Sequence, residues 1–187
     1  MKSEKIYFRK DIFLWGILIL PYCFLPLIYY LHIRELEKMD HAAIIIISKQ
    51  DMTLSLYKYN GKMVFRVPVA TGKSTGNKSV IGDMKTPEGV FHIESIESSD
   101  TWTHDFEDDN TGPIEGAYGP YFIRLNVPGQ KGIGIHGTHD NKSLGKRLTE
   151  GCVRLKNEDL TKLVRHISVS NIVIITPGKD DITSFNQ

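Results

Sequence analysis

Cysteine is scarce in this chain, which has Cys23 and Cys152 among its 187 residues. Any disulfide within the chain would therefore have to join these two. An excess of charge of one sign is also lacking, since 23 Lys and Arg residues stand against 22 Asp and Glu residues. That balance gives no electrostatic argument for binding nucleic acid, and we expect no nucleic-acid partner. Internal repeats and low-complexity segments are lacking too.

One long apolar run is present near the N-terminus. It covers residues 12–31, IFLWGILILPYCFLPLIYYL, and contains no charged residue. About 20 residues at 1.5 Å each are needed to cross a bilayer as a helix. The preceding residues 1–11 are rich in Lys and Arg, which favours a cytoplasmic N-terminus and an exported remainder. We therefore expect a single transmembrane helix in the cytoplasmic membrane, then a linker over residues 32–41 and an extracytoplasmic domain in the periplasm or cell wall.

The alternatives for this run are a cleaved signal peptide and a lipid-attachment site. The run is longer than a usual signal core and no small-x-small cleavage site follows it. Bulky residues precede Cys23, where lipid attachment requires small ones. If Cys23 lies within the membrane, it cannot pair with Cys152. Cys152 would then be an unpaired exported thiol, either an inert buried residue or a reactive one.

Downstream of residue 42 the pattern is mostly that of strands. Short apolar or alternating segments predict strands at 43–48, 52–59, 63–70, 90–96, 121–125, 132–136 and 171–176. Asn60-Gly61 predicts a hairpin turn between the second and third strands. Residues 97–119 form a long polar loop, and loops of this length are usually functional or disordered.

Helical signals are few. Residues 141–147 are compatible with one or two helical turns. Asn157 is a candidate N-cap for a helix over 158–166, in which apolar residues recur at helical spacing. We expect the polar tail at 179–187 to be flexible. The fold class is therefore mainly β, a β-sandwich or barrel with one or two short helices over residues 42–178, preceded by the transmembrane helix.

His136 and Cys152 are the candidate catalytic pair. His136 ends a predicted strand, Cys152 precedes a predicted helix, and each has a glycine beside it, Gly137 and Gly151. An imidazole can take the proton of a thiol and so activate it as a nucleophile. The helix start would favour a thiolate, and backbone N–H groups near Gly151 would stabilise an oxyanion. A backbone carbonyl such as that of Gly137 would orient the imidazole.

Three ordered motifs resemble one known family. Gly82-Asp83-Met84-Lys85-Thr86-Pro87-Glu88-Gly89-Val90-Phe91, His136-Gly137-Thr138 and Thr149-Glu150-Gly151-Cys152-Val153-Arg154 are similar to signatures of the L,D-transpeptidase catalytic domain. The resemblance covers residues 42–178. It implies a transferase acting on peptidoglycan stem peptides in cell-wall biogenesis and cell shape. In such an enzyme the cysteine attacks a stem carbonyl, a thioester forms, and an amine of a second stem resolves it. No metal or cofactor is expected.

The resemblance also implies roles for individual residues. Cys152 is the nucleophile and His136 the base, while Gly137 and Gly151 complete the catalytic set. Arg154, Thr149, Tyr121 and Glu150 are candidates for binding substrate. A structural role is the alternative for Arg154, as an ion pair, and for Tyr121, as a packing residue.

Glu150 departs from the family pattern, because many members have His at this position. A carboxylate near a thiolate disfavours the thiolate, but it can also bind a cationic part of the substrate. Two further functions remain open from the sequence. Water in place of the amine would make the protein an L,D-carboxypeptidase or a hydrolase that releases wall-attached groups. Loss of activity would leave a wall-binding module.

Overall fold

The computed structural model describes residues 24–34, 43–105 and 112–183. The chain divides into two compact units, 1–39 and 40–187. In the first unit, residues 24–34 are helical. Eleven residues rise only about 16 Å, against a hydrocarbon core of about 30 Å.

The predicted transmembrane helix is therefore wrong for this structure. Of the helices in the described ranges, none has the length and apolar character required to cross a membrane. Part of the apolar run, residues 12–23 with Cys23, lies outside the described residues, as do residues 1–11 and 35–42.

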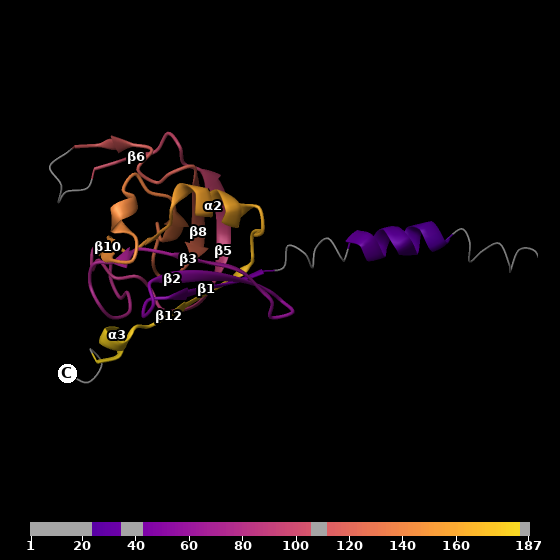
Figure 1. Cartoon of the computed structure of the whole chain (residues 1–187), viewed down its shortest axis with the longest axis horizontal. Helices are drawn as coiled ribbons and strands as arrows, with labels where there is room; N and C mark the ends of the chain where they lie inside the picture. The colour runs from indigo at the N-terminus through magenta and orange to yellow at the C-terminus, as the bar shows by residue number, and fades with distance from the viewer. Residues whose placement is uncertain (1–23, 35–42, 106–111, 184–187) are drawn as a thin grey trace, which may run out of the picture. The chain divides into compact units, whose positions relative to one another are not determined.

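The second unit is mainly β, as predicted (Figure 1). Its strands are β1 (Ala43–Ser48), β2 (Thr53–Lys58), β3 (Met63–Pro68), β4 (Thr71–Gly72), β5 (Gly89–Ser98), β6 (Thr103–His104), β7 (Ile114–Glu115), β8 (Tyr121–Asn126), β9 (Gly134–His136), β10 (Arg147–Thr149), β11 (Val153–Arg154) and β12 (Ile172–Thr176). Its helices are the 3-10 turn η1 (Asn141–Ser143), α2 (Asn157–Val164) and α3 (Lys179–Thr183).

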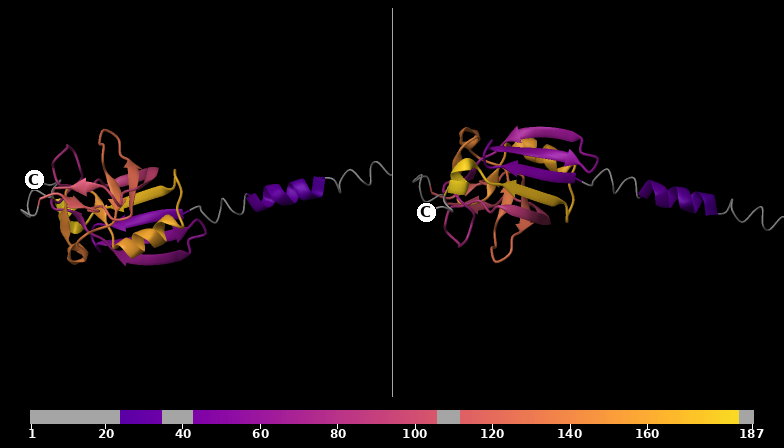
Figure 2. Two further views of the ribbon diagram at one scale, coloured as in Figure 1. Left: turned by 90° about the horizontal axis from the view of Figure 1, so that it is seen from above. Right: turned by 90° about the horizontal axis from the view of Figure 1, so that it is seen from below.

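Eight strands form one sheet in the order β11-β9-β8-β5-β12-β1-β2-β3. The predicted hairpin is confirmed: β2 and β3 pair antiparallel, and Gly61 in the turn has φ +80°. The two ends of the domain meet in the middle of the sheet, where β1 runs parallel to β12 with Ile45 opposite Val173. Both views in Figure 2 show the yellow β12 beside the purple strands.

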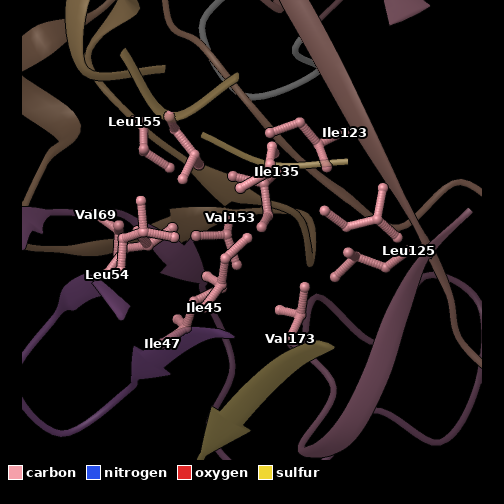
Figure 3. Close-up of a cluster of buried hydrophobic side chains, with 14 of the residues drawn as sticks. Ile45, Ile47, Leu54, Val69, Ile123, Leu125, Ile135, Val153, Leu155 and Val173 are labelled. Carbon is pink, nitrogen blue, oxygen red and sulfur yellow. The ribbon is translucent and has the colours of Figure 1, made fainter. Parts of the chain in front are cut away.

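The sheet curls until its two edges meet. Just beyond β3, Ala70 exchanges two backbone hydrogen bonds of 2.9 Å with Arg154 in the edge strand β11. Leu54 of β2 and Val153 of β11 consequently point into one apolar cluster although they lie near opposite ends of the strand order (Figure 3). This closure brings β9, which ends in His136, and β11, which directly follows Cys152, to one edge of the core.

Helix α2 matches the predicted helix but begins differently. Its Leu160 and Leu163 are fully buried in the core, as the helical spacing indicates. Asn157 is not the N-cap; Lys156 occupies that position without a capping side chain. The Asn157 Oδ1 instead accepts a hydrogen bond of 2.8 Å from the backbone N–H of Thr138. The helix start therefore fixes the loop that follows His136.

The C-terminal segment is not simply a flexible tail, because residues 179–183 form α3 and bury Asp181. The carboxylate of Asp181 lies 3.2 Å from Lys49 Nζ and 2.9 Å from Arg147 Nη2, and it accepts the backbone N–H groups of Gly76 and Gly178. Lys49 is itself 1% exposed and 2.5 Å from Glu88. A buried charge persists only when it is paired in this way. Residues 184–187 lie outside the described part of the chain.

Candidate active site

A cavity of about 390 Å³ opens where β8, β9 and β11 meet the loops around them. Residues from five separate parts of the sequence line it, among them His104, Tyr118, His136, Glu150, Cys152 and Arg154. The predicted pair His136 and Cys152 is thus brought to one pocket by the pairing of β9 with β11, which places Arg154 opposite His136.

His136 is held rigidly at the end of β9. Its side chain is buried, and its Nδ1 lies 2.7 Å from the carbonyl oxygen of Gly137, which was the orienting partner expected from the sequence. A carbonyl accepts hydrogen bonds only, so Nδ1 carries the hydrogen and Nε2 keeps its lone pair. The Phe122 ring stacks on the imidazole at 5.6 Å and the Tyr118 ring meets it edge-on at 4.8 Å.

The neutral form of His136 is favoured. Burial, and secondly the positive charge of Arg154, lower its pKa to about 3 in spite of the hydrogen bond to Gly137. A base must hold a free lone pair at the working pH. Neutral His136 has this lone pair, on Nε2, over the whole physiological pH range.

Close packing of the backbone at position 137 leaves no room for a side chain, so a glycine is required there. Its Cα lies against the backbone of Gly119, and a Cβ at position 137 would lie 2.9 Å from the Gly119 Cα and would also collide with the Asn157 amide oxygen. The Gly137 N–H donates to the Tyr118 carbonyl at 2.6 Å. These contacts set the carbonyl of Gly137 in place beneath the imidazole.

Cys152 lies immediately before β11, next to strand β9. Its Sγ donates to the carbonyl oxygen of Gly132 at 3.3 Å, and the backbone of Gly134 also hydrogen-bonds to the sulfur. Cys152 precedes helix α2, as expected from the sequence, but strand β11 lies between them and α2 begins at Asn157.

The turn before Cys152 is fixed by Thr149. Its hydroxyl donates to the Cys152 carbonyl at 2.5 Å and accepts the Gly151 N–H at 3.2 Å. Gly151 has φ +135°, and a Cβ there would lie 2.8 Å from the Lys85 carbonyl oxygen. Only glycine is unstrained in this conformation. Thr149, a predicted substrate-binding residue, is 2% exposed and braces the turn.

The thiol of Cys152 is neutral in the resting site. Burial raises its pKa to about 11; the Gly134 hydrogen bond opposes this rise, and the negative charge of Glu150 adds to it. With His136 also neutral, the two groups rest as thiol and imidazole. A nucleophilic attack by this sulfur would therefore require the proton to leave as the new bond forms.

The remaining predicted residues fall into two groups. Arg154 is 5% exposed and lines the cavity beside His136, and Glu150 lines it next to Cys152. Tyr121 is not among the described residues that line the cavity; it packs against the apolar core.

Sequence reasoning missed the aromatic wall that comes from the long polar loop. Tyr118, Trp102 and His104 all line the cavity, and the Trp102 ring contacts those of Tyr118 at 6.0 Å and Phe122 at 5.6 Å. The length of the loop was the available signal, together with the aromatic residues within a polar stretch.

The first residues of the Gly82–Phe91 motif and the residues just before them form another wall. Lys78, Gly82 and Met84 line the cavity, and Asp83 binds Lys78 at 2.8 Å. Asp83 also accepts the backbone N–H groups of Ser79 and Lys85. These bonds, opposed by partial burial, hold the pKa of Asp83 well below its usual range. The Asp83 carboxylate therefore stabilises the loop over residues 78–85.

Comparisons with known proteins agree with this arrangement. A family model described as the L,D-transpeptidase catalytic domain, YkuD, matches residues 42–175. The putative L,D-transpeptidase YqjB of Bacillus subtilis is 30% identical over 76% of this chain and 74% of its own length. The putative L,D-transpeptidase YkuD of Bacillus licheniformis is 30% identical over 71% of this chain and 65% of its own.

Solved structures show the same fold. The helical cell shape determining protein Pgp2 of Campylobacter jejuni superposes with a TM-score of 0.54 at 26% identity, over 74% of this chain and 48% of that one. The catalytic domain of an L,D-transpeptidase from E. faecium superposes with a TM-score of 0.53 at 22% identity, over 71% of this chain and 95% of that one. The chain thus spans about half the length of some of its structural relatives and nearly all of others.

Proposed function

This chain belongs to the L,D-transpeptidase catalytic-domain family, and from that premise we propose that it is an acyltransferase that joins peptidoglycan stem peptides through a thioester on Cys152. The observation that carries the proposal is the shared cavity of Cys152 and His136, in which the hydrogen bond to Gly137 leaves Nε2 as the basic atom.

In the first half-reaction, Cys152 attacks the carbonyl that precedes a D-residue in the donor stem. Because thiol and imidazole both rest neutral, the S–H proton passes to His136 Nε2 as the C–S bond forms. Burial makes the protonated imidazole a strong acid, so it returns the proton to the leaving amine. The D-residue departs and the donor stays on sulfur as a thioester.

Two further features support this chemistry. The backbone N–H of Cys152 is the proposed oxyanion donor. It lies in a turn that Thr149 holds fixed before substrate arrives, because the Thr149 hydroxyl donates to the Cys152 carbonyl and accepts the Gly151 N–H. Arg154, a buried cation lining the cavity, is placed to attract a carboxylate of the donor stem.

We place the activity outside the cytoplasmic membrane, because that is where assembled peptidoglycan stems lie. Two reporters fused after residue 187 test this location, one that is active only after export and one that is active only in the cytoplasm. The first fusion should be active. Activity of the cytoplasmic reporter alone would overturn the proposed location.

The enzymatic test uses purified disaccharide tetrapeptides, with products separated by liquid chromatography and identified by mass. The protein should form cross-linked dimers and release the terminal D-residue, whereas Cys152→Ala should form neither. Release of the D-residue without dimers, even at high acceptor concentration, would indicate hydrolysis instead. Equal activity of Cys152→Ala would exclude the proposed nucleophile.

A further inference from the structure

Glu150 is an exception in the charge pattern of the cavity. Among the described residues that line it, four are cationic, namely Lys78, Arg124, Lys131 and Arg154, and Glu150 supplies the carboxylate. The Glu150 side chain remains 44% exposed, so a ligand in the cavity can reach it. Lys78 and Arg124 pair with Asp83 and Glu97, which do not line the cavity. A positively charged group entering this pocket is therefore attracted to Glu150, whereas Lys131 and Arg154 repel it.

Glu150 is also held in place. The Nε2 of His104 lies 3.4 and 3.3 Å from its two carboxylate oxygens. The Nδ1 of the same imidazole lies 3.0 Å from the Tyr118 hydroxyl. When Tyr118 donates to Nδ1, the hydrogen of His104 is on Nε2 and points at Glu150. Tyr118 in turn packs edge-on against the ring of His136 at 4.8 Å.

This chain of contacts joins two remote segments at the site. His104 comes from β6, which pairs with β7 through His104 and Ile114, and Glu150 comes from the turn that presents Cys152. Glu150 and Tyr118 line the same cavity as Cys152, and one residue separates Glu150 from Cys152 in the chain. The carboxylate is therefore positioned beside the thioester that the proposed function places on Cys152.

The second half-reaction has a requirement that His136 cannot meet alone. An amine of an acceptor stem arrives as an ammonium ion at neutral pH. It must lose one proton before its nitrogen can attack and a second as the amide forms. His136 takes the second and returns it to the leaving sulfur. The first proton needs another acceptor at the cavity.

We propose that Glu150, positioned by His104 and Tyr118, binds the ammonium group of the acceptor stem and takes its first proton. This inference rests on the proposed function. The acceptor class is then a stem peptide bearing a free side-chain or terminal amine. The ammonium enters along the face formed by Glu150 and His104, while carboxylates of the donor stem lie toward the cationic residues.

The atoms balance as follows. The ammonium gives one proton to the Glu150–His104 pair, and the freed nitrogen lone pair forms the C–N bond at the thioester carbon. His136 Nε2 accepts the second proton from that nitrogen. The C–S bond breaks, its electron pair goes to sulfur, and His136 protonates the thiolate. The Glu150–His104 pair releases the first proton to solvent, which restores the resting site.

The test separates the two half-reactions in the full chain. Acylation is followed by intact mass with a tetrapeptide donor and no acceptor. Transfer is followed by product formation with an acceptor stem that carries an amine. For Glu150→Gln we expect the rate of transfer relative to the rate of acylation to fall by roughly 10- to 100-fold, as for loss of one charge-assisted hydrogen bond. Hydrolysed donor should accumulate in place of dimer.

Methoxyamine provides the control for disruption of the fold. It is uncharged at neutral pH and needs to lose only one proton, so its rate of transfer relative to acylation should be the same in Glu150→Gln and the parent. Equal loss with both amines would mean a damaged site and would overturn the proposal. The matched control variant is Glu115→Gln, an exposed carboxylate on β7 that does not line the described cavity, and it should behave as the parent.

The role of Tyr118 in positioning Glu150 is tested by the kinetic constants for the acceptor. Tyr118→Phe keeps the ring against His136 and removes the bond to His104. It should raise the KM of the ammonium acceptor severalfold relative to the KM of methoxyamine. Unchanged transfer in both Glu150→Gln and Tyr118→Phe, with normal acylation, would refute the inference. Failure of the parent itself to acylate would instead refute the proposed function.

Discussion

The burial of His136 makes a quantitative prediction about stability at acid pH. The folded-state pKa is about 3, lowered first by burial and then by Arg154. In the unfolded chain the pKa returns to about 6.5. Below that value the unfolded state binds a proton that the folded state does not. Stability is therefore unaffected by His136 above about pH 7.5 and falls as the pH drops through 6.5 toward 3.

The magnitude follows from the difference between the two pKa values. At pH 5 the proton taken up by the unfolded state is worth about 2 kcal/mol. His136→Asn removes the titration and retains an N–H that can donate to Gly137. Urea unfolding at pH 7.5 and pH 5 should show the parent losing about 2 kcal/mol more than His136→Asn between the two conditions.

Cys152→Ala is the control, since it abolishes the nucleophile but keeps His136. It should lose as much stability as the parent between pH 7.5 and pH 5. An equal pH-dependent loss in the parent and His136→Asn would refute the argument. So would an imidazole that titrates near 6.5 by NMR in the folded protein.

Three other substitutions test the packing around the site. Asp181→Asn leaves Lys49 and Arg147 without their shared buried carboxylate and should cost about 3 kcal/mol, measured as a lower thermal midpoint. Leu160→Ala opens a cavity under α2 and should cost about 2–5 kcal/mol in urea unfolding. Gly137→Ala places a methyl group against Gly119, so both thermal stability and the acylation rate should fall; retention of both would contradict the close packing described.

Local patterns predicted much of the fold because the features concerned are short-range. The run at 43–48 alternates buried and half-buried residues as a strand inside a sheet must, and Asn60-Gly61 dictates its turn whatever surrounds it. Leu160 and Leu163 mark the buried face of α2 by spacing alone. The carbonyl of Gly137 was predictable as the partner of His136 because it is the adjacent residue.

Other features depend on contacts between distant parts of the chain. Residues 179–183 are mostly polar, yet Asp181 is buried because Lys49 and Arg147, far away in sequence, pair with it. His104 reaches Glu150 only after the sheet has curled and β6 has paired with β7. The uncharged run at 12–31 is long enough for a membrane helix, but the described helical residues, 24–34, are too few to span a membrane.

Intact mass spectrometry of the protein mixed with a tetrapeptide donor stem, without acceptor, tests the central claim most directly. The parent should gain the mass of the donor less its terminal D-residue, and peptide mapping should place the adduct on Cys152. His136→Asn should acylate at least about 100-fold more slowly, as expected for loss of a general base. An unmodified parent, or an adduct that persists in Cys152→Ala, would contradict the account.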